Sequence, residues 1–128
     1  MVLVDSSVWI EYLSHYTSKV TSKLEELIRP ANRVAIAGII YQEVLQGIRN
    51  QHSIYLTQKL LERFPCLIPT LRTHLRAAEI FRDLALRGKT PSSIDTIIAA
   101  LAMENNVQLF TLDRDFRRIE THSNLKLF

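Results

Sequence analysis

Four short apolar segments of this chain each carry one acidic residue, either inside the segment or directly after it. The four are Asp5 after residues 2–4, Glu43 within residues 39–45, Asp95 within residues 94–102, and Asp113 after residues 107–112. Apolar segments are where a core forms, and a buried carboxylate is costly unless a positive group neutralises it. No Lys or Arg lies inside these segments. One shared partner, most simply a divalent cation, would satisfy all four acids, so the fold has to bring them together.

The hydrophobic pattern alternates between short apolar runs and amphipathic segments, which predicts strands separated by helices. We expect strands at residues 2–4, 34–37, 66–68, 107–110 and 125–127. We expect helices at residues 6–13, 18–28, 39–48, 52–64, 71–87 and 92–104, with a turn at Pro30 and Asn32. This alternation is typical of an α/β fold with a mainly parallel central sheet flanked by helices on both faces. Since the pattern shows no linker or repeat, we expect residues 1–128 to form one domain.

A parallel sheet gives the acids a common location, because sites in such sheets form beyond the carboxyl ends of the strands. Asp5 and Asp113 each follow a predicted strand and should lie on the same rim. Glu43 and Asp95 share helix faces with aliphatic residues three and four positions away, which turns them inward. Oxygen-only ligands suit Mg²⁺ or Mn²⁺ rather than zinc. The chain has no CxxC motif and its four histidines show no paired spacing, which also disfavours zinc.

Three of the four acids also have a purely structural interpretation as helix caps. Asp5 stands where it can cap the first helix, and Asp113 where it can cap a short helix through Phe116. Ser92 and Asp95 have the spacing of a capping box. Glu43 lies in mid-helix and has no cap to make. Capping stays open for each aspartate, while the joint occurrence of four acids favours a site.

The remaining charges and the single cysteine bear on partners and compartment. The formal net charge is +3, a modest excess that is compatible with a nucleic-acid partner. Basic stretches lie at residues 72–76 and 114–118, with local ion pairs such as Arg76 with Glu79 as the alternative use of these charges. Cys66 has no second cysteine to pair with, and no signal sequence or membrane-spanning run is present. These features predict a cytoplasmic protein without a membrane partner.

Four motifs, in order, resemble those of the PIN-domain ribonucleases. They are residues 4–10 around Asp5, residues 40–47 around Glu43, residues 91–100 around Asp95 and residues 109–116 around Asp113. Together they cover essentially the whole chain, which is similar in particular to the VapC toxins of bacterial and archaeal toxin–antitoxin pairs. The resemblance implies an endoribonuclease that depends on Mg²⁺ or Mn²⁺ and cleaves RNA with a metal-activated water. It also implies a homodimer that is inhibited by a VapB-type antitoxin.

The motif match assigns both catalytic and metal-binding roles to Asp5, Glu43, Asp95 and Asp113. We expect Asp5 and Asp95 to be the direct ligands, and the other two acids to act through water or to orient the attacking water. Ser7 and Asp115 are candidate accessory residues. Asp115 also fits the last motif, but helical spacing points it about 100° away from Phe116, toward the margin of the site or solvent. We therefore expect Asp113 to be the fourth acid.

Two other classes of protein share parts of this pattern. A receiver-type signalling domain needs an acid after its middle strand, whereas residues 66–68 are followed by Pro69 and Thr70. A non-catalytic PIN-like module that binds RNA or protein is the alternative to an enzyme, and four intact acids count against it. Metal-dependent RNA cleavage would distinguish the enzyme from the non-catalytic module.

The first predicted helix is richer in aromatic residues than a solvated helix needs. Trp9 is expected to pack in the core. A contact surface for a second copy or for the antitoxin is predicted at Tyr12, Leu13, Tyr16, Tyr41 and Ile48.

Overall fold

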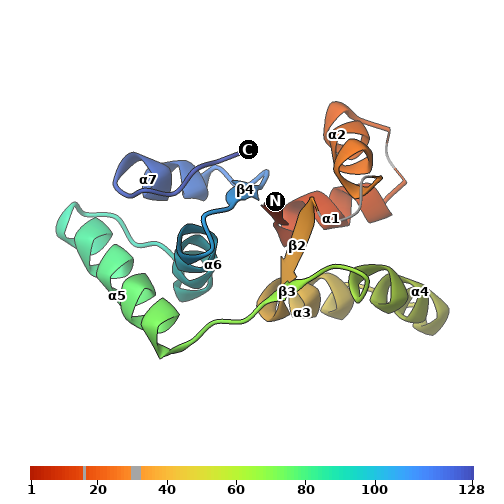
Figure 1. Cartoon of the computed structure of the whole chain (residues 1–128), viewed down its shortest axis with the longest axis horizontal. Helices are drawn as coiled ribbons and strands as arrows, with labels where there is room; N and C mark the ends of the chain where they lie inside the picture. Colours follow the sequence, from red (N-terminus) through yellow and green to blue (C-terminus); the bar gives the residue numbers. More distant parts are fainter. Residues whose placement is uncertain (16, 30–32) are drawn as a thin grey trace.

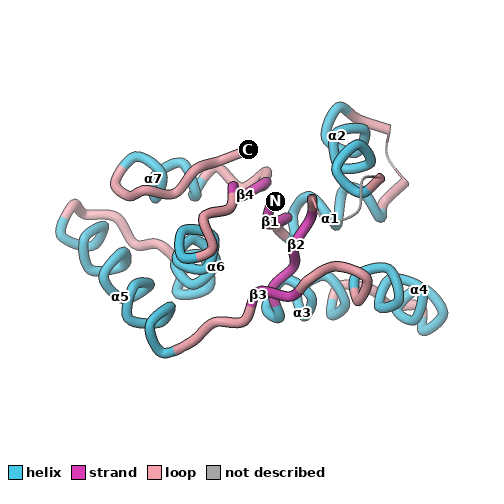
Figure 2. The backbone as a smooth tube through the Cα atoms, in the orientation of Figure 1, coloured by secondary structure: helices cyan, strands magenta, loops and turns pink. Residues whose placement is uncertain are grey.

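The computed structural model describes residues 1–15, 17–29 and 33–128, and this part of the chain contains one four-stranded sheet. The strands are β1 (Val2–Val4), β2 (Val34–Ala37), β3 (Cys66–Leu67) and β4 (Gln108–Phe110), in the spatial order β3-β2-β1-β4. Every pairing is parallel, so the carboxyl ends of the strands share one edge of the sheet (Figure 2). The expected parallel sheet is confirmed. The turn expected at Pro30 and Asn32, and the contact residue Tyr16, lie outside the described residues.

The fifth expected strand, at residues 125–127, is wrong. Leu127 makes only an isolated parallel bridge to Leu109. Two backbone hydrogen bonds support it, from Leu109 N–H to the Lys126 carbonyl and from Phe128 N–H to the Leu109 carbonyl, each 2.9 Å long. The apolar pattern of the segment therefore reflects its packing beside β4 rather than a fifth strand.

Helices connect the strands in the order that the sequence predicts, with ends that differ by a few residues. Within the described ranges they are α1 (Ser6–Leu13), α2 (Lys19–Ile28), α3 (Gly38–Gln46), α4 (Gln51–Leu61), α5 (Leu71–Leu86), α6 (Ser93–Glu104) and α7 (Asp115–Thr121). Figure 1 shows α5 and α6 on one side of the strands and α1, α2 and α4 on the other. The helices therefore cover both faces of the sheet, as expected. In the described part of the chain, no helix combines the length and the apolar character that a membrane crossing requires.

Local sequence signals explain where several helices begin and end. The Ser18 hydroxyl accepts a hydrogen bond from the Thr21 N–H, and the Thr21 hydroxyl accepts one from the Ser18 N–H, which forms a capping box at the start of α2. Gly88 has a φ of +74°, a left-handed conformation that glycine adopts at no steric cost, and α5 ends just before it. Residue choice at these points fixes the lengths of the helices that support the sheet.

The core lies on both sides of β1 and β2. Every residue of these two strands is buried, which explains why they read as continuous apolar runs rather than as alternating ones. Trp9 is fully buried, as expected, and its ring lies 5.5 Å from that of Phe64 and edge-on to Tyr12. Tyr12 is only half-buried and packs against the core. The strand ends and the start of α1 are thus held by close packing.

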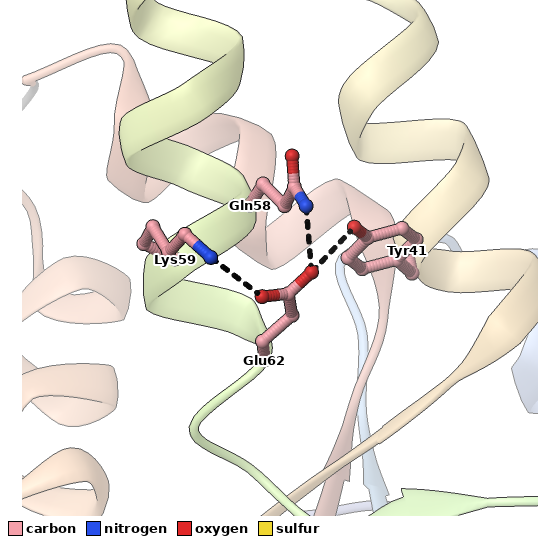
Figure 3. Close-up of polar contacts among 4 residues, drawn as sticks. All are labelled: Tyr41, Gln58, Lys59 and Glu62. Atoms are coloured by element: carbon pink, nitrogen blue, oxygen red, sulfur yellow. Dashed lines mark hydrogen bonds and ion pairs between the residues drawn. The ribbon is translucent and has the colours of Figure 1, made fainter.

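A polar cluster on the surface joins α3 to the end of α4 (Figure 3). The Tyr41 hydroxyl donates to Glu62 Oε1 at 3.3 Å, and Gln58 Nε2 donates to the same oxygen at 2.8 Å. Lys59 Nζ lies 3.5 Å from Glu62 Oε2. The hydrogen bond from Gln58 is the main cause that lowers the pKa of Glu62, while desolvation and then the charge of Glu62 raise the pKa of Tyr41. Exposed contacts of this kind add little stability, but they occupy the hydroxyl of Tyr41.

Candidate functional site

Asp5 lies at the carboxyl end of β1, and its side chain is held by two hydroxyl groups. The residue is 4% exposed. Its Oδ2 accepts hydrogen bonds from Ser7 Oγ at 2.6 Å and from Thr111 Oγ1 at 2.8 Å. It occupies the N-cap position of α1, yet its side chain makes no capping hydrogen bond. The capping alternative for Asp5 is therefore wrong, and its buried carboxylate is directed toward the end of β4.

The same two hydroxyls connect the ends of β1 and β4. The Asp5 N–H donates to the Phe110 carbonyl at 2.9 Å. Ser7 Oγ accepts from the Leu112 N–H, and Thr111 Oγ1 accepts from the Asp113 N–H, each at 3.0 Å. Asp5 and the segment after β4 are thus fixed relative to one another, as the shared rim of the sheet predicts.

Asp95 lies in the first turn of α6 and is partly buried. Its backbone N–H donates to Ser92 Oγ at 3.0 Å, so Ser92 caps the helix and supplies one of the two hydrogen bonds of the expected capping box. The pKa of Asp95 is raised from 3.8 to about 6, chiefly by burial and against an opposing hydrogen bond with Ser92. The negative charges of Asp113, Asp5 and Asp115, in that order, are smaller contributions to the same rise. The carboxylate of Asp95 is therefore in surroundings that lack positive charge.

Asp113 and Asp115 both reach Asp95. Carboxylate oxygens of these three residues lie within 4.8 Å of one another. Asp113 Oδ1 also accepts a hydrogen bond from the Asp115 N–H at 2.9 Å, which forms the turn that leads into α7. Asp115 was expected at the margin of the site or facing solvent; its side chain is exposed, and the turn before α7 leaves its carboxylate within reach of Asp95 and Asp113. Asp113 thus has a turn-forming role and belongs to the cluster as well.

Glu43 lies on α3 and is partly buried, as its position among aliphatic residues predicts. Its Oε2 accepts a hydrogen bond from Ser6 Oγ at 2.9 Å. Within the described ranges, neither Glu43 nor Asp5 belongs to the group that approaches within 4.8 Å. Ser6 and Ser7 are adjacent, and each hydroxyl binds a different acid, so the first turn of α1 positions both Asp5 and Glu43.

Sequence reasoning missed the contributions of Ser6 and Thr111. Both lie inside the motif segments, next to or two residues from an acid, which was the available signal. Their hydroxyls act on acids that are far away in sequence, by 37 and 106 positions. Ser7 was expected as an accessory residue, and it binds Asp5 directly.

The donor set of this site is entirely oxygen, and it carries an excess of negative charge. In the described part of the chain, none of the five acids forms an ion pair with a Lys or Arg. Carboxylate oxygens at this density suit a hard divalent cation such as Mg²⁺ or Mn²⁺. The raised pKa of Asp95 is consistent with a site that needs a cation. The five candidate acids are Asp5, Glu43, Asp95, Asp113 and Asp115, of which the last three form the cluster within 4.8 Å.

Comparison with known proteins gives one family match and several similar structures. The sequence matches the PIN domain family over residues 2–121. Ribonuclease VapC11 of Mycobacterium tuberculosis is 31% identical over 129 residues, an alignment that covers 98% of this chain and 96% of that protein.

Solved structures of similar fold come from toxin–antitoxin complexes. The crystal structure of VapBC2 from Rickettsia felis, bound to a DNA fragment from its promoter, superposes with a TM-score of 0.81 and 20% identity and covers 100% of this chain and 98% of that one. A toxin–antitoxin complex from Klebsiella pneumoniae gives a TM-score of 0.75 and 22% identity, with 91% and 90% coverage. At these identities the structures establish the shared fold.

Proposed function

The chain belongs to the PIN-domain family and, within it, to the VapC group, and from this premise we propose that it is a divalent-metal-dependent endoribonuclease. The observation that carries the proposal is the convergence of Asp95, Asp113 and Asp115 within 4.8 Å, beside the buried Asp5. The similarity to a protein named as a ribonuclease supports RNA as the substrate. The acids hold the charge that a cation would balance, and no other role in the fold accounts for all of them.

In this proposal Asp5 and Asp95 bind the cation directly, and Glu43 and Asp113 act through water. Asp115 is an accessory acid. Ser7 and Thr111 keep Asp5 in place with hydrogen bonds of 2.6 and 2.8 Å. A bound Mg²⁺ or Mn²⁺ would supply a water of lowered pKa and would balance charge on the phosphoryl oxygens.

The biological role that fits this activity is that of the toxin in a VapBC-type pair. The similar structures are toxin–antitoxin complexes, which supports a VapB-type antitoxin as the partner. We further propose that residues 1–128 act as one domain, that the protein is a cytoplasmic homodimer, and that Tyr12, Leu13, Tyr41 and Ile48 contribute to a protein contact. Light scattering of the purified protein tests the dimer, and co-purification with the product of a neighbouring gene tests the antitoxin.

A cleavage assay tests the enzymatic proposal. Single-stranded RNA is incubated with the protein in Mn²⁺, in Mg²⁺ and in EDTA, and cleavage is expected only with metal. Asp95→Asn is expected to abolish cleavage while circular dichroism shows an intact fold. Asp83→Asn, which removes one exposed carboxylate from α5 outside the site, is the matched control and should cleave normally. Undiminished cleavage by a folded Asp95→Asn protein would falsify the proposal and favour a non-catalytic PIN-like binding module.

A further inference from the structure

Two arginines beside the acids are not used by the fold. Arg114 and Arg117 are exposed at the start of α7 and lie three positions apart. Neither forms an ion pair with any residue of the described ranges. By contrast, Arg76 on α5 and Arg87, which follows its last residue, each pair with an acid of that helix, at 3.1 and 3.5 Å. Ion pairs with nearby acids therefore account for Arg76 and Arg87. Arg114 and Arg117 have no such ion pair in the described part of the chain.

Arg114 and Arg117 line a groove that begins at the acidic site. The groove has a volume of about 600 Å³, and Thr111 and Asp113 lie along it. Thr111 holds Asp5, and Asp113 belongs to the acidic cluster. Figure 1 shows the carboxyl-terminal end of the chain beside β4, in agreement with the hydrogen bonds between Leu109 and residues 126 and 128. A ligand strand that is bound at the acids and runs along this groove would therefore contact both arginines.

Phe128 adds an aromatic ring to the lining of the groove, and Lys23, which is ion-paired with Glu26, lies over that ring from outside the lining. Phe128 is 40% exposed and packs on Phe110 with 5.1 Å between ring centres. Lys23 Nζ lies 5.7 Å from the centre of the Phe128 ring. Glu120 also lines the groove, but its Oε1 accepts the Leu127 N–H at 3.1 Å and so helps to hold the lining in place. Positive charge and an exposed aromatic ring thus occur together along one groove.

We propose that this groove binds the RNA strand next to the cleaved bond, with Arg114 and Arg117 on a neighbouring backbone phosphate. The inference rests on the proposed ribonuclease function. Guanidinium groups bind phosphate oxygens through two parallel hydrogen bonds, which makes arginine well suited to this role. The exposed ring of Phe128 offers a surface for a sugar or a base, as aromatic residues do in proteins that bind single strands. The two arginines add affinity for RNA and position the strand, but contacts to phosphate do not select a base sequence.

The test compares the double variant Arg114→Gln/Arg117→Gln with a matched control, Arg76→Gln/Arg87→Gln, which removes the same charge from α5. Binding of a fluorescein-labelled single-stranded RNA is measured by anisotropy in Ca²⁺ at several KCl concentrations, with recovery of intact RNA as a check. Cleavage of the same RNA is measured in Mn²⁺. Thermal melts establish that each variant is folded, and single Arg117→Gln replaces the double variant if the latter is not.

We expect the double variant to bind RNA at least about 10-fold more weakly. The slope of log affinity against log salt should fall in magnitude by roughly 0.7 for each RNA phosphate that the variant no longer neutralises. Its kcat at saturating RNA should stay near the parent value while KM rises. The α5 control should match the parent in affinity and in slope.

Two outcomes distinguish a failure of the groove proposal from a failure of the ribonuclease proposal. A double variant that binds as tightly as the parent, or a control whose affinity falls as far as that of the double variant, overturns the groove but leaves the ribonuclease proposal intact. A parent that binds RNA through these arginines and never cleaves it supports the groove and overturns the ribonuclease.

Discussion

The acids on the α1 side of the site and those on the α6–α7 side are stabilised in different ways. Asp5 and Glu43 each accept hydrogen bonds from serine or threonine hydroxyls. Asp95, Asp113 and Asp115 instead approach one another within 4.8 Å, and the pKa of Asp95 is raised to about 6. The first pair is fixed in position before any ligand arrives, whereas the second group carries charge that no ion pair of the described residues balances. The site therefore combines a rigid half with a half that is under electrostatic strain.

The largest expected effect is on activity and tests whether both halves are needed. Asp5→Asn and Asp95→Asn should each reduce RNA cleavage at least about 1,000-fold, equivalent to roughly 4 kcal/mol of transition-state stabilisation. Single-turnover cleavage in saturating Mn²⁺ measures both. Asp5 would be structural rather than catalytic if its folded Asn variant kept more than about a tenth of the parent rate, since a tenfold change is only about 1.4 kcal/mol.

The next effect concerns metal and stability. Because a cation binds the folded site and not the unfolded chain, Mn²⁺ at about 100 times its Kd should stabilise the protein by roughly 2.7 kcal/mol. Differential scanning fluorimetry should show a rise in Tm of several degrees. Asp83→Asn should respond like the parent, and Asp95→Asn should respond much less. An equal rise for all three proteins would mean that the metal binds elsewhere.

The third prediction concerns the free energy of unfolding without metal, which should change in opposite directions when an acid of each half is neutralised. Because the folded-state pKa of Asp95, about 6, exceeds the ordinary value of 3.8, the folded protein binds the proton more tightly than the unfolded chain does. Stability from this group is therefore present below pH 3.8 and is lost as pH rises through 6. In EDTA at about pH 8, Asp95→Asn should be more stable than the parent, by at most about 3 kcal/mol, and Asp5→Asn should be less stable because a neutral amide oxygen accepts the two hydroxyl hydrogen bonds more weakly than a carboxylate does.

Urea unfolding at about pH 4 and about pH 8, on either side of the Asp95 titration, measures this difference. The advantage of Asp95→Asn over the parent should nearly vanish at the lower pH. An Asp95→Asn protein that is less stable than the parent at the higher pH in EDTA would show that the carboxylate is structural.

The smallest expected effect distinguishes the two acids of the last motif. Asp113 raises the pKa of Asp95 more than Asp115 does, so it interacts more strongly with that carboxylate. We expect Asp113→Ala to lose about 10-fold more activity than Asp115→Ala, a difference of roughly 1.4 kcal/mol. Both are compared under saturating Mn²⁺. An inactive Asp115→Ala beside an active Asp113→Ala reverses the assignment.

The sheet was predictable because apolar runs without alternation are characteristic of strands buried on both faces. The positions of Asp5, Glu43, Asp95 and Asp113 were predictable as well, since strand ends and inward helix faces follow from local pattern. The error at residues 125–127 has a physical cause. This apolar segment packs beside the edge strand β4 through a single bridge, and its sequence pattern is the same as that of a short strand.

The site was less predictable than the fold. The hydroxyls of Ser6 and Thr111 act on acids that adjoin them only in three dimensions. The approach of the Asp115 carboxylate to Asp95 was not predictable, because helical spacing from Phe116 ignores the turn formed by Asp113 and the Asp115 N–H. Periodicity describes the interior of a helix and does not apply to the residue that begins it.

The hydrogen bond between Asp5 and Thr111 has a consequence for synthesis of the protein. The two residues are 106 positions apart, and β1 pairs with β4 only after nearly the whole chain exists. At about 5–20 residues per second, a ribosome makes Asp5 roughly 5–20 seconds before the group that holds it. A nascent chain that lacks β4 therefore carries an incomplete site. Full assembly of the site therefore waits until the segment after β4 has left the exit tunnel.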